Sequence, residues 1–389
     1  MSKKSFQLKN FEKKFLIHRE RKKSFKILKK FLNEYNEIIE SLSTNYKNNY
    51  TKKQLYKYKK KYLNYRLIGI GGSILGAKAI YNFLKDKIQK NFIFIDNLHQ
   101  RKNCKKNKNF LNLIVSKSGN TIETIINSNI FIKKKDKNIF ITENKESYLL
   151  TLAKKLKSEI VYHNNFIGGR YSVLSEVGML PAELMGLNPN RFKRFNHLIK
   201  NKSFLNDLVN NVATTYSLLM RKKFNSVIIN YDEKSNNLFN WYQQLIAESL
   251  GKKNKGFLPI ISSMPKDNHS VLQFYLDGPK NNFFTFFYVH NRNGTKIKNN
   301  LLLPKHNFLK NKHIKDIIYA QKKATENVFT KKNIPFRSFE IPVRNEEALG
   351  ELFCFFTLET ILLGRMLNVN PFDQPAVELI KKETKKLLI

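Results

Sequence analysis

The stretch Leu111-Asn-Leu-Ile-Val-Ser-Lys-Ser-Gly-Asn-Thr121 decides the fold class of this chain of 389 residues. It begins with a short apolar run, Leu111–Val115, and passes directly into a loop of hydroxyl residues, lysine and glycine. An apolar stretch with helical character, residues 122–132, follows the loop. A short apolar strand that leads at once into a helix is typical of a parallel sheet covered by helices on both faces.

The same alternation recurs on both sides of this stretch. Apolar runs separated by helix-like segments occur at Leu67–Ile70, Phe92–Ile95, Leu111–Val115 and Ile139–Ile141, and again at Val227–Asn230, Phe257–Ile261, Phe283–Val289 and Phe339–Ile341. Two rounds of one pattern predict an α/β protein with two successive αβα units and mainly parallel sheets. We expect residues 61–200 to form the first unit and residues 201–389 the second.

The first 60 residues differ from the rest of the chain. They lack strand signals, and their apolar residues have helix-compatible spacing: Phe15, Ile17, Phe25, Ile27, Leu28, Phe31 and Leu32. We therefore expect residues 1–60 to form an N-terminal helical arm that packs on the larger body. Because many lysines interrupt the stripe, a flexible basic tail is the alternative.

The composition limits the compartment and the partners. No apolar run reaches the length of a membrane span, and Met1-Ser-Lys-Lys leads into charged residues without an apolar signal core. Cys104 and Cys354 are the only cysteines, too few for a disulfide framework or a thiolate metal site, so we expect a cytoplasmic protein. We also expect no metal and no cofactor.

The net charge of +41 is the most unusual number in the composition. It is compatible with a nucleic-acid or anionic-membrane binder. However, the basic residues are mostly lysine, they spread along the whole chain, and Asn and Ile are also abundant. Because these three residue types share AT-rich codons, a biased genome accounts for the pattern, and we expect neither a membrane nor a specific nucleic-acid partner.

Two turns after apolar runs carry the features of ligand-binding loops. In Gly69-Ile-Gly-Gly-Ser-Ile-Leu-Gly76 the sixth position is Ile74, so the dinucleotide fingerprint fails. Gly71 and Gly72 would let the backbone approach a ligand and Ser73 would supply a hydroxyl, but a plain structural turn fits equally well.

The turn Ser116–Thr121 is more informative. It places three hydroxyl residues, a glycine and a lysine at the start of an apolar helix. Free backbone N–H groups and the helix dipole favour an anion there, so this turn predicts a site for a phosphate monoester. The alternative is that Ser118 or Thr121 simply caps the helix.

Two further segments carry polar groups at helical spacing. Asn240–Leu250 predicts a helix that ends at Gly251 and presents Gln244 and Glu248 one turn apart on one face. Near the end of the chain, Gln374 and Lys381 are seven residues apart, which places them on one face of a helix with Pro375 in its first turn. Lys381 as a solvated end residue is the alternative.

Six blocks in order carry a family resemblance. They are Gly69–Gly76, Ser116–Thr124, Gly168–Gly178, Trp241–Lys252, Asp267–Ser270 with Asp277–Pro279, and Asn370–Glu378. In these residues the chain resembles the glucose-6-phosphate isomerase (phosphoglucose isomerase) family, and the blocks run over most of its length. The resemblance implies two sugar-isomerase (SIS-type) αβα sandwich domains, in agreement with the two units.

The resemblance also implies roles for individual residues. Ser116, Ser118 and Thr121 hold the sugar phosphate, Lys117 contributes through the loop backbone, and Gly72 and Ser73 line the same pocket. Glu248 matches the catalytic base, Arg170 the cation beside the reacting oxygens, and His269 a ring-opening histidine that a neighbouring subunit donates. Gln244, Gln374 and Lys381 match polar residues around the open-chain sugar, while Glu176 and Asp373 look like structural supports.

The chemistry that these roles imply is the reversible isomerisation of glucose 6-phosphate and fructose 6-phosphate. One carboxylate moves a proton between adjacent carbons through a cis-enediol, and a guanidinium stabilises the enediolate oxygen. A histidine supplied in trans implies a homodimer. The alternatives are a bifunctional glucose/mannose-6-phosphate isomerase, a sugar-phosphate-binding regulator without activity, and an electrostatic binder of nucleic acid.

Overall fold

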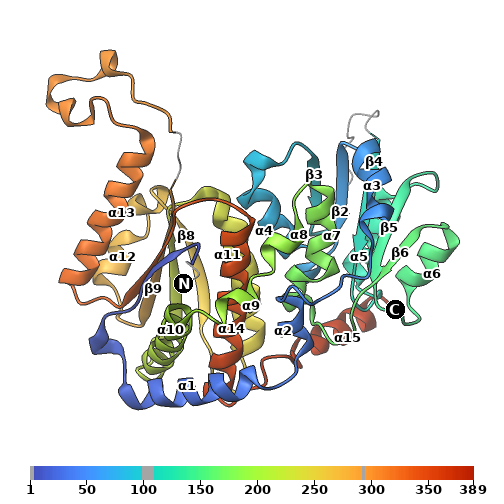
Figure 1. The fold of residues 1–389 in the computed structure, drawn as a ribbon, viewed down its shortest axis with the longest axis horizontal. Helices are drawn as coiled ribbons and strands as arrows, with labels where there is room; N and C mark the ends of the chain where they lie inside the picture. Colours follow the sequence, from blue (N-terminus) through green and yellow to red (C-terminus); the bar gives the residue numbers. More distant parts are fainter. Residues whose placement is uncertain (1–3, 99–108, 291–293) are drawn as a thin grey trace.

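The computed structural model describes residues 4–98, 109–290 and 294–389, and these residues form two five-stranded sheets (Figure 1). Cys104 lies outside the described residues. The first sheet has the order β3-β2-β4-β5-β6, and all of its neighbouring strands run parallel. Its strands are β2 (Asn64–Ile68), β3 (Asn91–Ile95), β4 (Phe110–Val115), β5 (Lys137–Thr142) and β6 (Glu159–Tyr162).

Both faces of the first sheet are buried. Leu67, Leu113 and Ile139 pack in the large core on one face, whereas Ile68, Ile114 and Phe140 pack in a second cluster on the other. The helices around this sheet are α3 (Lys52–Lys61), α4 (Leu75–Phe83), α5 (Ile122–Phe131), α6 (Tyr148–Lys155) and α7 (Glu176–Leu184). This is the predicted αβα unit, with its continuous apolar strands covered on both sides.

The second sheet has the order β1-β10-β9-β7-β8. Its strands are β1 (Gln7–Lys9), β7 (Asn225–Asn230), β8 (Leu258–Ser263), β9 (Asn282–Val289) and β10 (Phe336–Ile341). All neighbours are parallel except β1, which pairs antiparallel with β10 at the edge. Around this sheet lie α10 (Lys202–Met220), α11 (Asn236–Leu250), α12 (Leu272–Asp277), α13 (Ile314–Lys331) and α14 (Glu346–Met366). The predicted fold class is therefore confirmed.

The N-terminal segment is helical, as expected, but it is not only helical. Helix α1 (His18–Leu32) packs against α10 and α14 and buries Leu28 and Phe31, so the flexible-tail alternative is wrong for residues 4–60. Strand β1 contradicts the expectation that this segment lacks strands, because three residues at a sheet edge leave no apolar pattern to read. The proposed boundaries of the two units remain predictions.

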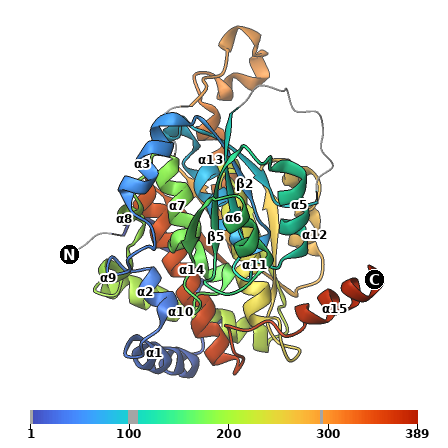
Figure 2. The same cartoon turned by 90° about the vertical axis from the view of Figure 1, so that its right-hand side faces the viewer.

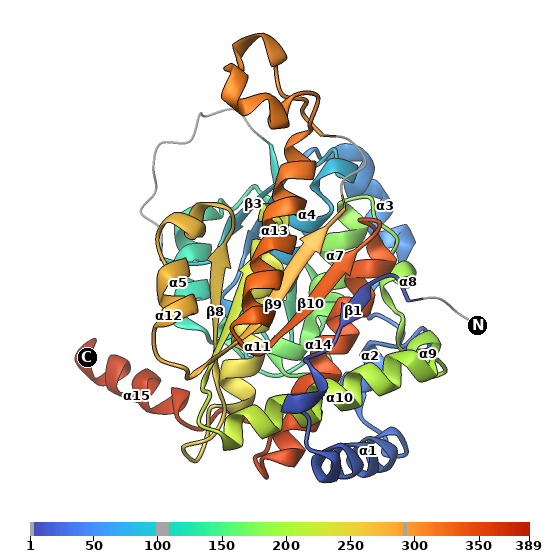
Figure 3. The same cartoon turned by 90° about the vertical axis from the view of Figure 1, so that its left-hand side faces the viewer.

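The last helix stands apart from the body. Helix α15 (Val377–Leu387) projects to the side in Figures 2 and 3, and it buries none of its residues. The remaining short helices, α2 (Glu37–Ser41), α8 (Pro189–Phe192) and α9 (Phe195–Leu198), lie on the body. In the described part of the chain, no helix combines the length and the apolar character needed to cross a membrane.

A buried ion pair lies against helix α11. The guanidinium of Arg337 on β10 pairs with the carboxylate of Glu359 on α14, and both side chains are 1% exposed. Arg337 Nη2 also donates to the hydroxyl of Tyr242 on α11 at 3.3 Å. The pair thereby connects the sheet and α14 to the inner face of α11.

We predict that Glu359→Gln lowers the free energy of unfolding by about 3–5 kcal/mol, because Arg337 would remain as an unpaired buried charge. Urea unfolding followed by the fluorescence of Trp241, which is the single tryptophan and lies buried on α11, measures this change. The control is Glu383→Gln on α15, which removes an exposed pair with Lys386 and should leave the urea midpoint unchanged. Equal midpoints for both variants would contradict the prediction.

Candidate active site

Helix α11 presents Gln244 and Glu248 as the sequence predicts. Its inner face buries Trp241, Tyr242 and Leu245, and the helix ends at Gly251, whose N–H donates to the carbonyl of Ala247. Gln244 and Glu248 lie one turn apart, and Gln244 Nε2 donates to Glu248 Oε1 at 2.9 Å. The Glu248 side chain is 31% exposed, so one oriented carboxylate faces solvent from a rigid helix.

Arg170 is the centre of the site. It lies on the 3₁₀ helix η4 (Gly169–Leu174), is 3% exposed, and uses all five N–H donors of its guanidinium. Its acceptors are Ser249 Oγ (2.8 Å), Glu248 Oε2 (3.2 Å), Gln374 Oε1 (2.7 Å), the carbonyl of Pro371 (2.7 Å) and the carbonyl of Asp373 (3.1 Å). Arg170 therefore joins η4, α11 and the segment before α15.

The turn after β2 reaches this centre through glycine. The 3₁₀ helix η2 (Gly71–Ser73) packs so closely on η4 that a Cβ on Gly72 would lie 2.2 Å from the carbonyl carbon of Gly169. A Cβ on Gly71, which has φ +56°, would lie 2.8 Å from Gln244 Nε2. The two glycines are therefore required for close approach between backbones.

The serine-rich loop follows β4, the strand next to β2. Ser116 Oγ and Thr121 Oγ1 are 3.0 Å apart, and Gly119 has φ +65°. Thr121 occupies the N-cap position of α5, but its side chain makes no capping hydrogen bond, so the capping alternative is wrong for this residue. The Ser118 hydroxyl accepts from the backbone N–H of Asn120 at 3.3 Å. The first turn of α5 thus remains open to an anion.

Lys117 and Ser73 take different positions around this loop. Lys117 Nζ donates to the carbonyl of Asn165 at 2.7 Å and pairs with Glu143, and its backbone carbonyl accepts from the N–H of Glu143 at 3.1 Å. A Cβ on Gly69 would lie 3.2 Å from Ser73 Cβ and 3.0 Å from the carbonyl oxygen of Val115. The turn after β2 therefore lies between Gln244 on one side and the start of the serine-rich loop on the other.

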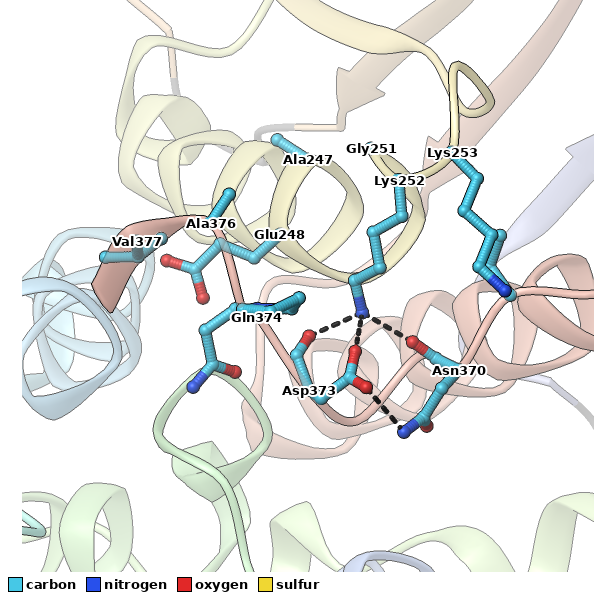
Figure 4. Close-up of a pocket in the computed structure, with 12 residues that line it drawn as sticks. Ala247, Glu248, Gly251, Lys252, Lys253, Asn370, Asp373, Gln374, Ala376 and Val377 are labelled. Carbon is cyan, nitrogen blue, oxygen red and sulfur yellow. Dashed lines mark hydrogen bonds and ion pairs between the residues drawn. The ribbon is translucent and has the colours of Figure 1, made fainter. Parts of the chain in front are cut away.

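A cavity of about 580 Å³ lies beside Glu248 (Figure 4). It is lined on one side by α11 and the residues after it, and on the other by residues 369–377. Lys252 donates to the carbonyl of Asn370 and to Asp373 Oδ1, and the hydrogen bond to the carboxylate lowers the pKa of Asp373. The volume is typical of a small-molecule site with a few polar groups.

Among the predicted site residues, Glu248 and Gln374 line this cavity, whereas the serine-rich loop and the turn after β2 do not. His269 and Lys381 lie outside both the cavity lining and the hydrogen bonds of Arg170. His269 is exposed on the 3₁₀ helix η6 (Lys266–His269), after β8, and Lys381 is 62% exposed on α15, where it pairs with Glu378 at 2.6 Å. Gln374 precedes α15, which begins at Val377. The expectation that Gln374 and Lys381 share one helical face is therefore wrong, because residues 373–374 are not helical.

The structure adds residues that the sequence analysis does not single out. Ser249 accepts from Arg170 Nε, and its Oγ lies 2.9 Å from the hydroxyl of Tyr171. Burial raises the pKa of Tyr171, so its hydroxyl keeps a proton and donates to the carbonyl of Pro371 at 3.0 Å. Ser249 directly follows Glu248 on a predicted helix, but nothing in the sequence pairs it with Arg170.

Comparison with known proteins places the chain in a family. A family model described as phosphoglucose isomerase matches residues 9–256. The chain belongs to the phosphoglucose isomerase family. A relative, the glucose-6-phosphate isomerase of Methanocaldococcus jannaschii, is 33% identical over 376 residues, which cover 90% of this chain and 92% of that protein. The expected resemblance is therefore confirmed.

Solved structures show that the fold is shared. A hypothetical protein from Thermus thermophilus matches with a TM-score of 0.82 at 24% identity, over 98% of this chain and all of that one. A glucose-6-phosphate isomerase from Chlamydia trachomatis matches with a TM-score of 0.68 at 19% identity, over 90% of this chain and 73% of that chain. Both structural similarities agree with a fold of two αβα units.

We predict that Gly72→Ala destabilises the protein by about 1–3 kcal/mol, because the added methyl group meets backbone atoms that have no free rotamer. Thermal unfolding measures this change. The matched control is Gly168→Ala in the facing turn, where an added Cβ would meet only Tyr171 Cδ2 at 3.8 Å and should leave the unfolding temperature unchanged. A stable Gly72→Ala protein would show that the two turns do not need their close contact.

Proposed function

We infer that this protein catalyses the reversible isomerisation of glucose 6-phosphate and fructose 6-phosphate. Relatives that match most of the chain bear the name glucose-6-phosphate isomerase. The observation that carries the inference is the pairing of Glu248 with Arg170 at 3.2 Å beside a cavity of suitable size. A base and a fixed cation in contact are what proton transfer through an enediolate requires.

The roles follow from the geometry of the two groups. Glu248 takes the proton from one carbon of the open-chain sugar and returns it to the neighbouring carbon. Each of its oxygens accepts one hydrogen bond, from Gln244 or from Arg170, which orients the carboxylate and leaves lone pairs free to take a proton. Arg170 then stabilises the negative charge of the enediolate oxygen, and the hydrogen bonds from its other N–H groups hold the guanidinium in place.

We propose that the serine-rich loop holds the phosphate. The hydroxyls of Ser116, Ser118 and Thr121, the loop backbone at Lys117 and the open first turn of α5 supply donors, while Gly72 and Ser73 line the neighbouring turn. Gln374 beside Arg170 and Gln244 beside Glu248 contact the sugar. The net charge of +41 attracts such an anionic substrate.

We also propose a homodimer in which His269 serves the site of the partner and opens the sugar ring. Within the described residues His269 makes no side-chain hydrogen bond, and it is exposed. Two other parts of the chain leave apolar side chains uncovered: α15, with Ile380 72% exposed, and the arm formed by residues 294–313, with Leu301 77% exposed (Figures 1 and 3). A second copy would cover such surfaces. Lys381 on α15 would then join the site.

The location remains a proposal. We propose a cytoplasmic location because Cys354 is a free, buried thiol, and because the reaction uses a phosphorylated sugar of central metabolism. Burial raises the pKa of Cys354 to about 12, which keeps this thiol unreactive.

We predict that Glu248→Gln lowers kcat for fructose 6-phosphate by about 10²–10⁴-fold, the typical contribution of a general base. A coupled assay that detects glucose 6-phosphate measures the rate. The control is Glu233→Gln, an exposed glutamate just before the same helix, which should keep the rate of the unsubstituted protein. Unchanged turnover of Glu248→Gln would remove Glu248 as the base.

The dimer is tested by mixing two inactive variants, Glu248→Gln and His269→Asn, after reversible unfolding. If His269 acts in trans, each mixed dimer holds one site with both native groups, and a 1:1 mixture recovers about a quarter of full activity. If His269 acts within its own subunit, every site stays defective and the mixture remains inactive. Analytical ultracentrifugation of the unsubstituted protein checks the oligomeric state independently.

A further inference from the structure

The two ends of the segment that carries Arg170 are joined by a buried histidine–glutamate pair. His163 lies before η4 and Glu176 lies after it, at the start of α7. His163 Nδ1 is 2.7 Å from Glu176 Oε1, and the two side chains are 1% and 0% exposed. The pair closes residues 163–176 into a loop with Arg170 near its middle.

Hydrogen-bond geometry sets the protonation of this pair. The second ring nitrogen, His163 Nε2, is 3.0 Å from the carbonyl oxygen of Ile167, which can only accept. Nε2 must therefore carry a hydrogen. The first ring nitrogen faces a carboxylate oxygen, so the pair as a whole holds one proton more than a neutral imidazole beside a carboxylate.

The surroundings of Glu176 place that proton on the histidine. Glu176 Oε1 also accepts from the backbone N–H of Asn164 at 2.9 Å, and Oε2 accepts from the hydroxyl of Tyr46 at 2.9 Å. Burial alone would raise the pKa of Glu176, but the hydrogen bonds, with that of His163 foremost, lower it below its ordinary value. An ionised carboxylate between three donors leaves His163 as a buried cation whose two N–H groups both donate.

The bond to Ile167 matters because two glycines follow it. Gly168 and Gly169 lie between Ile167 and Arg170, and such residues restrict the backbone least. Ile167 is fully buried, and the carbonyls of both glycines are anchored as well, because they accept from the backbone N–H of Tyr171 at 3.0 Å and from the hydroxyl of Ser172 at 2.7 Å. On the far side, Gly169 contacts Gly72 of the first turn. A shift at Ile167 would therefore move both Arg170 and the contact between η4 and η2.

We propose that His163 and Glu176 form a charged positioning pair that fixes the turn before Arg170, and that His163 thereby supports the isomerase reaction without touching substrate. This proposal rests on the proposed function for its kinetic part. His163 makes two hydrogen bonds in this role: one ring N–H donates to Glu176, and the other donates to the carbonyl of Ile167.

Other ionisable groups face the pair from several elements. Burial, followed by the charge of Glu176, raises the pKa of Tyr46, so that its hydroxyl stays a donor. Lys193, after α8, donates to the backbone carbonyl of Tyr46, and burial lowers its pKa to about 8. Glu37 on α2 accepts from the side chain of Asn164 at 3.1 Å, and burial raises the pKa of the nearby Tyr50.

The kinetic test is a double-mutant cycle with Arg170. His163→Gln keeps at most one of the two hydrogen bonds, so we expect kcat for fructose 6-phosphate to fall about ten- to a hundredfold, the effect of a small misplacement of a reacting group. KM should change less than kcat, because the hydroxyls of the serine-rich loop lie between β4 and α5, and among the described residues of that loop only the side chain of Lys117 bonds to the loop that the pair closes, at the carbonyl of Asn165. In an Arg170→Lys background, His163→Gln should lower kcat no further. If the two losses multiply, His163 does not act through Arg170 and the proposal fails.

A spectroscopic test does not depend on activity. In ¹⁵N–¹H correlation spectra of the wild-type protein at pH 7.5, one of the eight histidines should show two slowly exchanging ring N–H signals, and these should disappear in His163→Gln. The Nε–H signal of Arg170, identified by its loss in Arg170→Lys, should shift in the same variant. If His163→Gln does not fold, Tyr46→Phe, which removes one donor to Glu176, should shift the same signals. A single ring N–H on His163 would overturn the proposal.

The matched control is His290→Gln. His290 also pairs with a carboxylate, Glu340 on β10 at 3.1 Å, but its side chain is 42% exposed and it follows β9 of the second sheet. This variant should keep kcat and the Arg170 signal. A wild-type protein without isomerase activity would refute the proposed function and leave the spectroscopic result to decide the charged pair, whereas an active wild type with an unaffected His163→Gln variant would refute the positioning role alone.

Discussion

The arrangement of this protein around its site depends on the buried guanidinium of Arg170. A charged group that is 3% exposed is stable only when its donors are satisfied, and all five are: by Ser249, Glu248, Gln374 and two backbone carbonyls. These acceptors come from α11 and from the segment that precedes α15, whereas Arg170 comes from the first unit. One side chain therefore aligns parts of the chain that lie up to 204 residues apart.

Close backbone contact makes this alignment possible. Gly72 lies against Gly169, and Gly71 lies against Gln244, so the turn after β2 touches both η4 and α11. Helix α11 also packs against α4 of the first unit and against α14 and β8 of the second. Glu248 on α11 is thus held from two sides, and one short turn, rather than a long loop, separates its helix from the serine-rich loop. A rigid scaffold of this kind keeps the reacting groups in place without substrate.

Much of this arrangement can be predicted from the sequence, for identifiable reasons. The eight predicted strands correspond to strands of the two sheets, because short apolar runs between helices are typical of a covered parallel sheet. Strands β6 and β1 escape prediction: β6 has four residues at one edge, of which only Val161 is buried, and β1 has three residues at another.

Some residues of the candidate site can also be predicted from the sequence, and others cannot. Gln244 and Glu248 follow from helical spacing, but the partners of Arg170 include the carbonyls of Pro371 and Asp373, and backbone acceptors leave no signal in a sequence. The sequence places Gln374 on a helix, wrongly, because Pro375 suits a first turn as well as the turn that precedes α15.

The end of the chain contrasts with the buried surroundings of Arg170. Residues 374–377 form part of the cavity wall and lead directly into α15, which buries nothing and leaves Leu379, Ile380 and Leu387 more than half exposed. An isolated amphipathic helix of eleven residues is marginal in water, because its stability normally comes from the surface that covers its apolar face. Within the described chain, nothing comparable to the hydrogen bonds of Arg170 fixes the orientation of α15 or the position of Lys381. Arg170 holds Glu248 in place, whereas Lys381, which lies outside the cavity lining, has only its pair with Glu378 on the same exposed helix.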